Sequence, residues 1–258
     1  AAAPDDQAPR IVANEQGKNL SSQFNLYSDR LDNLKNRILS QSKNAVTSVN
    51  LLLSQLSSIN EDLLTSGLTS QTSNAKLDQR DLLIDQLSEI SQITVNYGAR
   101  GDALIRLGNT GSGPIILEKE IVNKIEVLQQ GQRLQPVVGL NKISTNQIQG
   151  GIIGGLVDSF AIVGDTQNEI DNLAIIVARN FNNINQNGLN LDGEVGKSMF
   201  SVIGLQAIPN ATNRTSVGAE IVVEDPEKII KDNYSLEYNK VSNSWTLNSE
   251  SLKTPIIS

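Results

Sequence analysis

The chain has 258 residues and a formal net charge of −7, with 38% hydrophobic and only 3% aromatic residues. This acidic balance argues against nucleic acid or an anionic membrane surface as the partner. The chain contains neither cysteine nor histidine, which excludes disulfides and thiolate chemistry and removes the commonest general base and metal ligand near neutral pH.

The N-terminal residues 1–16 are polar and include Pro4 and Pro9, so we expect a frayed lead-in. They lack the charged-then-apolar pattern of a secretion signal, and no apolar run in the chain reaches membrane-spanning length. We therefore expect no membrane partner and no cleavable signal peptide. The first residue is Ala and the last residues follow an apolar pair, so we expect a fragment of a longer protein.

Residues 20 to about 64 are predicted to form one long amphipathic helix, roughly 65 Å in length at 1.5 Å per residue. Apolar residues recur there at steps of three and four, which aligns them in one narrow seam. From Ile38 through Gln41 and Ala45 to Val49 the steps are three, four and four residues. An extra step of four in this spacing is a stutter, which locally unwinds a coiled coil. The apolar positions are Leu20, Phe24, Tyr27, Leu31, Leu34, Ile38, Ala45, Val49, Leu52, Leu56, Ile59 and Leu63.

Residues 75–91 are predicted to form a second, shorter helix with Leu77, Ile84 and Leu87 on one side. Carboxylates occupy other positions of this helix at three- and four-residue spacing, at Asp78, Asp81, Asp85 and Glu89. Paired carboxylates can act as acid and base. Since Lys76 and Arg80 lie nearby and no second cluster defines a cleft, we expect a solvated face with surface ion pairs.

A third helix is predicted from Ile153 to Ile184, where the three–four spacing returns with Gln167 as its polar member. A narrow apolar seam is stable only against another seam, because an isolated helix buries none of its apolar residues. We therefore expect this helix to pair with the first long helix as an antiparallel bundle.

Between these helices, residues 92–151 are predicted to form a small inserted β domain. Short β-rich runs at 93–97, 103–107, 115–117, 121–128 and 134–138 are separated by Gly, Pro and Asn. After the third helix, residues 200–258 are expected to begin a second β domain, which is incomplete. Alternation at 217–223, 234–238 and 245–247 predicts its first strands.

No motif in the sequence supports catalysis, a cofactor or a metal. The glycine-rich loop 108–113 lacks the lysine and the strand–loop–helix setting of a phosphate-binding loop. The stretch from Gly188 to Met199 lacks oxygen donors at the first and twelfth positions of a calcium loop. No serine has a credible base partner. We therefore expect a protein that is not an enzyme.

Several short sequence segments resemble those of the bacterial flagellar hook-associated protein 1 family, the first hook–filament junction proteins. The most specific is Leu77-Asp78-Gln79-Arg80-Asp81, together with Leu87-Ser88. The others are Gln23-Phe24-Asn25, Val49-Asn50, Ile59-Asn60-Glu61, Gly150-Gly151 to Leu156, Ile170-Asp171, Leu173-Ala174, Phe181-Asn182, Asn187-Gly188, Asp192-Gly193 and Met199-Phe200. The resemblance covers roughly residues 14–200.

This resemblance implies a helical domain that packs beside its neighbours in a tubular array, with β domains that project outward. It implies a structural subunit that joins hook to filament through lateral and axial contacts, exported through the flagellar secretion channel to the extracellular flagellum. The implied partners are copies of the chain itself, the hook protein, the second junction protein, and an export chaperone that binds the C-terminal region missing from this fragment.

Two alternatives stay open. Flagellin and the other junction protein share the helical-rod plan. A surface adhesin would use its β domains to bind, although Trp245 is the lone tryptophan available for stacking on sugars.

The predicted architecture is therefore multidomain α and β, a long antiparallel helical rod with a small inserted β domain and a second, truncated one. The expected boundaries are 12–91 plus 152–188 for the rod, 92–151 for the insertion and 200–258 for the last domain. The residues expected to carry the rod seam are Leu31, Leu34, Leu52, Leu56, Ile59, Leu87, Phe160, Ile170, Val177 and Phe181.

Overall fold

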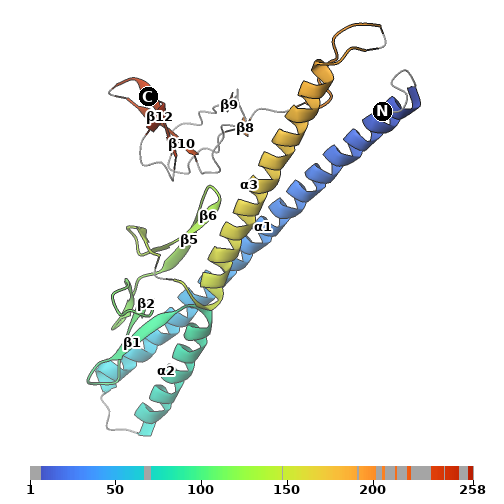
Figure 1. The fold of residues 1–258 in the computed structure, drawn as a ribbon. Helices are drawn as coiled ribbons and strands as arrows, with labels where there is room; N and C mark the ends of the chain where they lie inside the picture. Colours follow the sequence, from blue (N-terminus) through green and yellow to red (C-terminus); the bar gives the residue numbers. More distant parts are fainter. Residues whose placement is uncertain are drawn as a thin grey trace. The chain divides into compact units, whose positions relative to one another are not determined.

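The computed structural model describes most of the chain up to residue 201 and short segments beyond it (Figure 1). The described residues are 7–66, 71–146, 148–190, 192–201, 205–206, 213, 220–221, 234–240, 242–249 and 255–257. The chain divides into two compact units, one of Leu20–Asp171 and one of Ala1–Asn19 with Asn172–Ser258.

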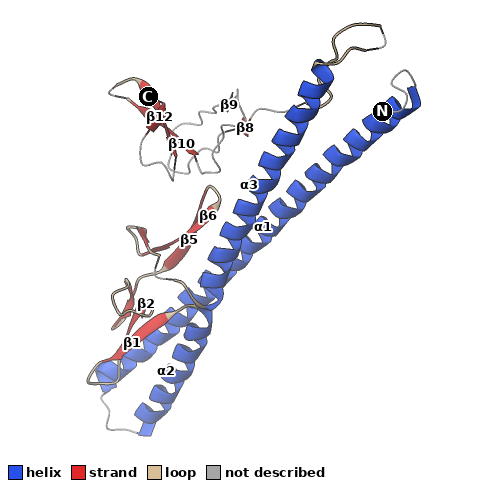
Figure 2. Ribbon diagram, in the orientation of Figure 1, coloured by secondary structure: helices blue, strands red, loops and turns tan. Residues whose placement is uncertain are grey.

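Three helices account for most of the described residues, α1 (Gln7–Ser66), α2 (Gln71–Ile90) and α3 (Gly151–Gln186) (Figure 2). Within Leu20–Asp171, α3 runs antiparallel to α1 (Figure 1). The prediction of a frayed lead-in is wrong for residues 7–16, which belong to α1. Pro9 is compatible with this because it lies in the first turn, where the proline's missing N–H has no intrahelical partner to lose.

The insertion between α2 and α3 contains two small antiparallel sheets. The first has the strand order β1 (Ile93–Tyr97), β2 (Ala103–Leu107), β3 (Ile115–Glu118) and β4 (Ile121–Val122). The second has the order β5 (Ile125–Gln130), β6 (Arg133–Val138) and β7 (Ile143–Ser144).

The single strand expected at 121–128 is wrong, because the chain divides there into β4 and β5. Asn123 causes the break. Its main-chain N–H donates to the Ile116 carbonyl at 3.0 Å, and its side-chain amide donates to the Ile115 carbonyl at 3.0 Å. The chain is thereby tied to β3 before it enters the second sheet.

The helices and strands of Leu20–Asp171 share one hydrophobic core. Strand β2 turns alternate residues inward, so that Ala103, Ile105 and Leu107 are fully buried. The other large side chains below 2% exposure come from every helix and from both sheets: Val49, Leu53, Leu56, Leu63, Leu87, Ile116, Leu117, Ile125, Ile153 and Phe160. The strands are therefore packed on the helices rather than around a separate core.

In the other unit, residues 197–200 fold back on the end of α3. The Asn182 carbonyl oxygen of the side chain accepts the main-chain N–H groups of Met199 and Phe200, both at 2.8 Å. The side-chain amide of Asn182 donates to the Phe200 carbonyl at 2.8 Å. One side-chain amide thus ties the main chain at Met199 and Phe200 to the end of α3.

Further strands follow: β8 (Leu205–Gln206) pairs with β9 (Glu220–Ile221), and β10 (Tyr234–Asn239), β11 (Ser244–Ser249) and β12 (Pro255–Ile257) form a three-stranded antiparallel sheet. The strands predicted at 234–238 and 245–247 are confirmed. Of the alternating stretch 217–223, only Glu220–Ile221 is among the described residues. The described helices and antiparallel sheets confirm the predicted mixed α and β class.

Candidate functional site

The described residues place no group of three or more Asp and Glu side chains where it could hold a metal ion. None of the helices described has an apolar stretch long enough to cross a membrane. The distinctive chemistry lies instead in buried and half-buried polar side chains that fasten the strands to the helices. We call Asn50, Ser57, Asn60 and Arg80 the docking residues.

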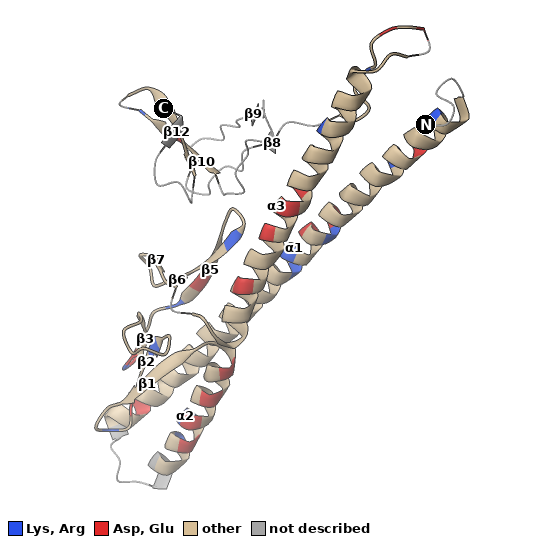
Figure 3. Ribbon diagram, in the orientation of Figure 1, with Lys and Arg blue, Asp and Glu red and all other residues tan. Residues whose placement is uncertain are grey.

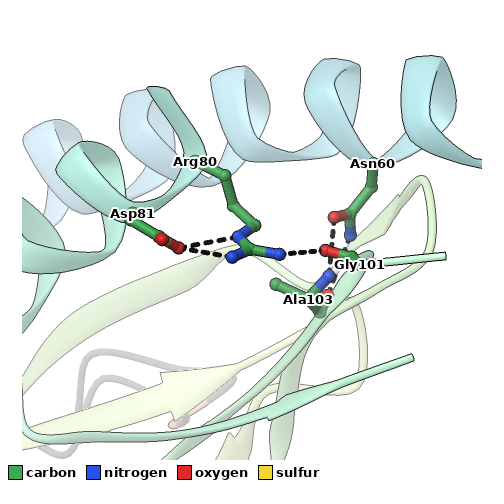
Figure 4. A network of polar contacts seen from close by, with 5 residues as sticks. All are labelled: Asn60, Arg80, Asp81, Gly101 and Ala103. Atoms are coloured by element: carbon green, nitrogen blue, oxygen red, sulfur yellow. Dashed lines mark hydrogen bonds and ion pairs between the residues drawn. The ribbon is translucent and has the colours of Figure 1, made fainter. Parts of the chain in front are cut away.

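Asn60 is fully buried on α1 and bonds the start of β2 and the residue after β3 in the first sheet (Figure 4). Its side-chain amide donates to the Ala103 carbonyl at 2.8 Å, and its side-chain oxygen accepts the Ala103 N–H at 2.8 Å. The same amide donates to the Lys119 carbonyl at 2.7 Å. Every polar atom of the buried Asn60 side chain is therefore paired, as burial of an amide requires.

Two more α1 side chains repeat this arrangement. The Ser57 hydroxyl donates to the Glu120 carbonyl at 2.7 Å, next to the turn that Asn60 holds. Asn50 exchanges two 2.9 Å hydrogen bonds with the main chain of Ile125, where the second sheet begins. Asn50 and Asn60 are ten residues apart, about 15 Å along a helix. One helix therefore fixes the root of each sheet.

Arg80 of α2 is 8% exposed and reaches the loop between β1 and β2. Its guanidinium donates to the Gly101 carbonyl and makes bonds of 2.8 and 2.6 Å to one carboxylate oxygen of Asp81 (Figure 4). It also lies 4.2 Å from the centre of the Tyr97 ring. Gly101 has φ of 80°, a left-handed conformation that glycine adopts without strain. The buried charge is thus fully paired.

A second polar cluster joins α1, α3 and the turn between β5 and β6. The Lys35 ammonium donates to the side-chain oxygens of Gln132 and, at 3.2 Å, of Gln167. The Gln167 amide in turn donates to the Asp32 carboxylate at 2.9 Å. We call Asp32, Lys35, Gln132, Gln167 and Asp171 the polar cluster.

Burial shifts the pKa values of Lys35 and Asp171 in this cluster in opposite directions. It lowers the pKa of Lys35 from 10.5, although the carboxylates of Asp32 and Asp171 act to raise it. Burial, together with the nearby Asp32 carboxylate, raises the pKa of Asp171 above 3.8, against the pull of Lys35. The charged forms of both groups are therefore disfavoured by their burial in the folded chain.

The turn between β5 and β6 lies directly on α3 at Gly164. A Cβ at Gly164 would stand 2.9 Å from the Gln132 Cβ and 3.0 Å from the Gln132 carbonyl oxygen, closer than side chains normally approach. Next to it, both outer nitrogens of Arg133 lie 3.3 Å from the Asp165 carboxylate. The hairpin thus touches α1 through Lys35 and α3 through Gly164 and Asp165.

The predicted seam residues fall into three groups by exposure. Five are buried in the shared core, namely Leu52, Leu56, Ile59, Leu87 and Phe160. Leu31, Ile170 and Val177 are half-buried, and of these Leu31 packs against that core. Leu34 and Phe181 are 40% and 48% exposed, so the expectation that they lie in a buried seam is not met.

The exposure of Leu34 has a local cause. The buried face of α1 passes through Leu31, Lys35, Ile38 and Ser42, so that two polar residues occupy it. Ser42 is tolerated because its hydroxyl donates to the Ile38 carbonyl at 2.8 Å. Leu34 and Gln41, which the apolar spacing favoured, lie one position off this face. Phe181 instead packs edge-on against Phe200, with ring centres 5.9 Å apart.

The docking residues and the polar cluster were not predicted as functional side chains. A weak indication was present, since Asn50 and Asn60 each follow a predicted seam residue inside a helix, where asparagine is unfavourable. Their partners lie 75 and 43 residues away in the chain, and no local pattern identifies them.

A family model described as the flagellar hook-associated protein FlgK helical domain matches residues 1–200. Flagellar hook-associated protein 1 of Bacillus subtilis (strain 168) is 27% identical over 246 residues, which cover 84% of this chain and 48% of that protein. Flagellar hook-associated protein 1 of Escherichia coli (strain K12) is 21% identical over 252 residues, covering 93% of this chain and 45% of that protein.

The fold is similar to that of the flagellar hook junction protein FlgK from Burkholderia pseudomallei, with a TM-score of 0.78 and 22% sequence identity. That match covers 99% of this chain and 47% of the other. The chain thus spans about half the length of the curated relatives it matches. Because the family model covers most of the sequence, the chain belongs to the FlgK helical-domain family of flagellar hook-associated proteins.

Proposed function

We propose that the protein to which this chain belongs is a structural subunit of the bacterial flagellum, which forms the junction between hook and filament through lateral and axial contacts. The observation that carries the proposal is the match of residues 1–200 to the FlgK helical domain. Both relatives described above are named flagellar hook-associated protein 1, which favours this role over flagellin or the other junction protein.

The described contacts suit a subunit that transmits force. Besides sharing the hydrophobic core, the strands of the insertion are fastened to α1 by Asn50 and Asn60 and to α2 by Arg80. Because these side chains are hydrogen-bonded to the main chain of the insertion, a load applied to the insertion passes to the helices. We therefore propose a scaffold role without catalysis.

We also propose the division into a helical rod (12–91 plus 152–188), an inserted β domain (92–151) and a last β domain (200–258). The first seven strands, which lie between Ile93 and Ser144, support the position of the insertion. In this proposal the buried seam residues hold the rod together.

The proposed partners are other copies of the chain, the hook protein and the second junction protein. An export chaperone would bind a C-terminal region outside this sequence. The protein would be exported through the flagellar secretion channel and act in the extracellular flagellum.

Deletion of the gene tests the proposed function. Mutant cells are expected to keep their hooks, to lack filaments and to release flagellin into the medium, and the intact gene is expected to restore filaments. Normal filaments on the deletion strain would contradict the junction role. Loss of hooks as well as filaments would place the protein earlier in assembly and would also contradict it.

A further inference from the structure

We propose that an acidic stripe on α2 of one copy docks against a basic stripe on α1 of a second copy. The acidic stripe consists of Asp78, Leu82, Asp85 and Glu89, and the basic stripe of Arg30, Leu34 and Arg37. This inference rests on the proposed function, in which copies of the chain assemble side by side, and it names the surfaces that meet.

The acidic stripe is a surface without internal charge compensation. Residues spaced by four and seven lie on one face of a helix, so Asp78, Leu82 and Asp85 line up, with Glu89 continuing the row. All four are exposed, Leu82 to 58%. The neighbouring cations are engaged elsewhere, since Lys76 pairs with Asp62 at 2.6 Å and Arg80 with Asp81 at 2.6 Å.

Within the described part of the chain, no cation lies within ion-pair distance of Asp78, Asp85 or Glu89. Like charges four and seven residues apart on a helix repel each other. The stripe is therefore a surface that an opposing row of cations would stabilise, which goes beyond the solvated face with ion pairs predicted from the sequence.

The basic stripe on α1 repeats the same pattern with the opposite charge. Arg30 and Arg37 are seven residues apart, and Leu34 lies between them at the fourth position, 40% exposed. Arg30 stands 6.0 Å from the Tyr27 ring centre, and neither arginine has an ion-pair partner among the described side chains. Figure 3 shows basic residues along this part of α1 and acidic residues along α2.

The two stripes match position for position. Each has a charge, a leucine four residues later and a second charge three residues after that. When the leucines face each other, both charges of one stripe fall opposite charges of the other sign. The exposed leucines supply an apolar centre, and the charges exclude pairing of two identical stripes.

The stripes of one chain cannot meet each other. The Lys76–Asp62 ion pair places the start of α2 beside the end of α1, and from there α2 runs back along α1 as far as Ile90. Glu89 is thus level with about residue 49 of α1, and Arg37 lies about 18 Å further along. Only a second copy, shifted along the helix axis, brings the stripes together.

Cysteine cross-linking tests the contact, because the chain has no cysteine of its own. Leu34→Cys and Leu82→Cys variants of the 258-residue chain are mixed and treated with a short bismaleimide. We expect several-fold more cross-linked dimer than from a matched mixture of Leu34→Cys with Ile162→Cys, since Ile162 is 65% exposed on α3 and lies outside both stripes. Circular dichroism verifies that each variant keeps its helices.

Charge exchange makes the test specific. R30E/R37E added to the Leu34→Cys chain, or D78K/D85K added to the Leu82→Cys chain, is expected to reduce the yield to that of the control mixture. Combining the two reversed chains is expected to restore it, because the charges are again complementary. Raising the salt from 0.1 to 1 M, which shortens the Debye length from about 10 to about 3 Å, should reduce the yield.

A yield no greater than that of the Ile162 control would overturn the proposal. So would a yield that is unchanged by the single reversals or that is not restored by the double one. These outcomes are separate from the gene deletion: a strain with hooks but no filaments combined with absent cross-links would refute this interface and leave the junction role standing.

Discussion

At the residue scale, Asn60 shows how one side chain can decide whether a sheet docks. It is fully buried and satisfies three main-chain groups, two on Ala103 and one on Lys119. Asn60→Ala would leave these groups without their partner, and buried unpaired groups cost about 1–3 kcal/mol each. We expect the free energy of unfolding to fall by about 3 kcal/mol, measured by urea denaturation.

Asn36→Ala is the matched control for this substitution, because Asn36 is an exposed residue of the same helix. Alanine is the better helix former, so the control is expected to be neutral or slightly stabilising, by up to about 0.5 kcal/mol. Equal effects of the two substitutions would refute the docking role of Asn60.

The neighbouring leucines Leu51 and Leu52 provide a second residue-scale prediction. Leu52 is 9% exposed and belongs to the shared core, whereas Leu51 is 60% exposed. Leu52→Asp buries an unpaired charge, so we expect a loss of at least about 3 kcal/mol in the free energy of unfolding. Leu51→Asp is expected to cost less than about 1 kcal/mol. A native-like thermal melting curve for Leu52→Asp would contradict the packing of the rod.

At the element scale, the β5–β6 hairpin approaches α3 most closely at Gly164, where the helix lacks a side chain. Gly164→Ala would press a methyl group against the Cβ and the carbonyl oxygen of Gln132, so we expect it to be destabilising although alanine favours helix. Gly155→Ala in the same helix meets no atom within 4 Å, and we expect it to stabilise by up to about 1 kcal/mol.

Hydrogen exchange locates the effect of the hairpin substitution. For Gly164→Ala, faster exchange is expected at residues 125–138, with β1–β4 unchanged. Equal stabilisation by both alanine substitutions, with hydrogen exchange at residues 125–138 unaltered, would show that the hairpin does not depend on the close contact between Gln132 and Gly164.

The polar cluster predicts a pH dependence. Because the folded pKa of Asp171 is raised above 3.8, the folded chain binds this proton more readily than the unfolded chain, so acidification adds to stability through Asp171. Asp171→Asn removes the charge permanently. We expect the variant to be more stable than the parent at pH 7, with the difference shrinking as the pH falls through the raised pKa. Urea unfolding from pH 7 to pH 3 measures the difference, and a gap that widens on acidification would contradict it.

The elements themselves were largely predictable from sequence, and the contacts between them were not. Leu56 in α1 and Phe160 in α3 each belong to a row of apolar residues at helical spacing. The helices and their pairing therefore follow from the local sequence pattern. Ser42 and Lys35 on the buried face break that pattern, because a polar side chain can be buried where a carbonyl or an amide lies within reach. Asn123 likewise ends a strand through bonds that only the folded sheet provides.

At the scale of the whole molecule, a long helix pair carries strands that are held by the side-chain amides of Asn50 and Asn60 and by the buried guanidinium of Arg80. Single lateral contacts between copies are weak, since an exposed ion pair contributes about 0.2–1 kcal/mol. Many such contacts in an array add up, so the folded chain is expected to be mainly monomeric in dilute solution and to form a stable array only in the assembled flagellum.

Electron cryo-microscopy of the hook–filament boundary, in flagella from the source bacterium, tests the account most directly. We predict that the antiparallel pair of α1 and α3, with the two small sheets fixed to α1, fits density confined to a short zone at that boundary. Density for this fold along the filament, or its absence from the boundary, would contradict the account.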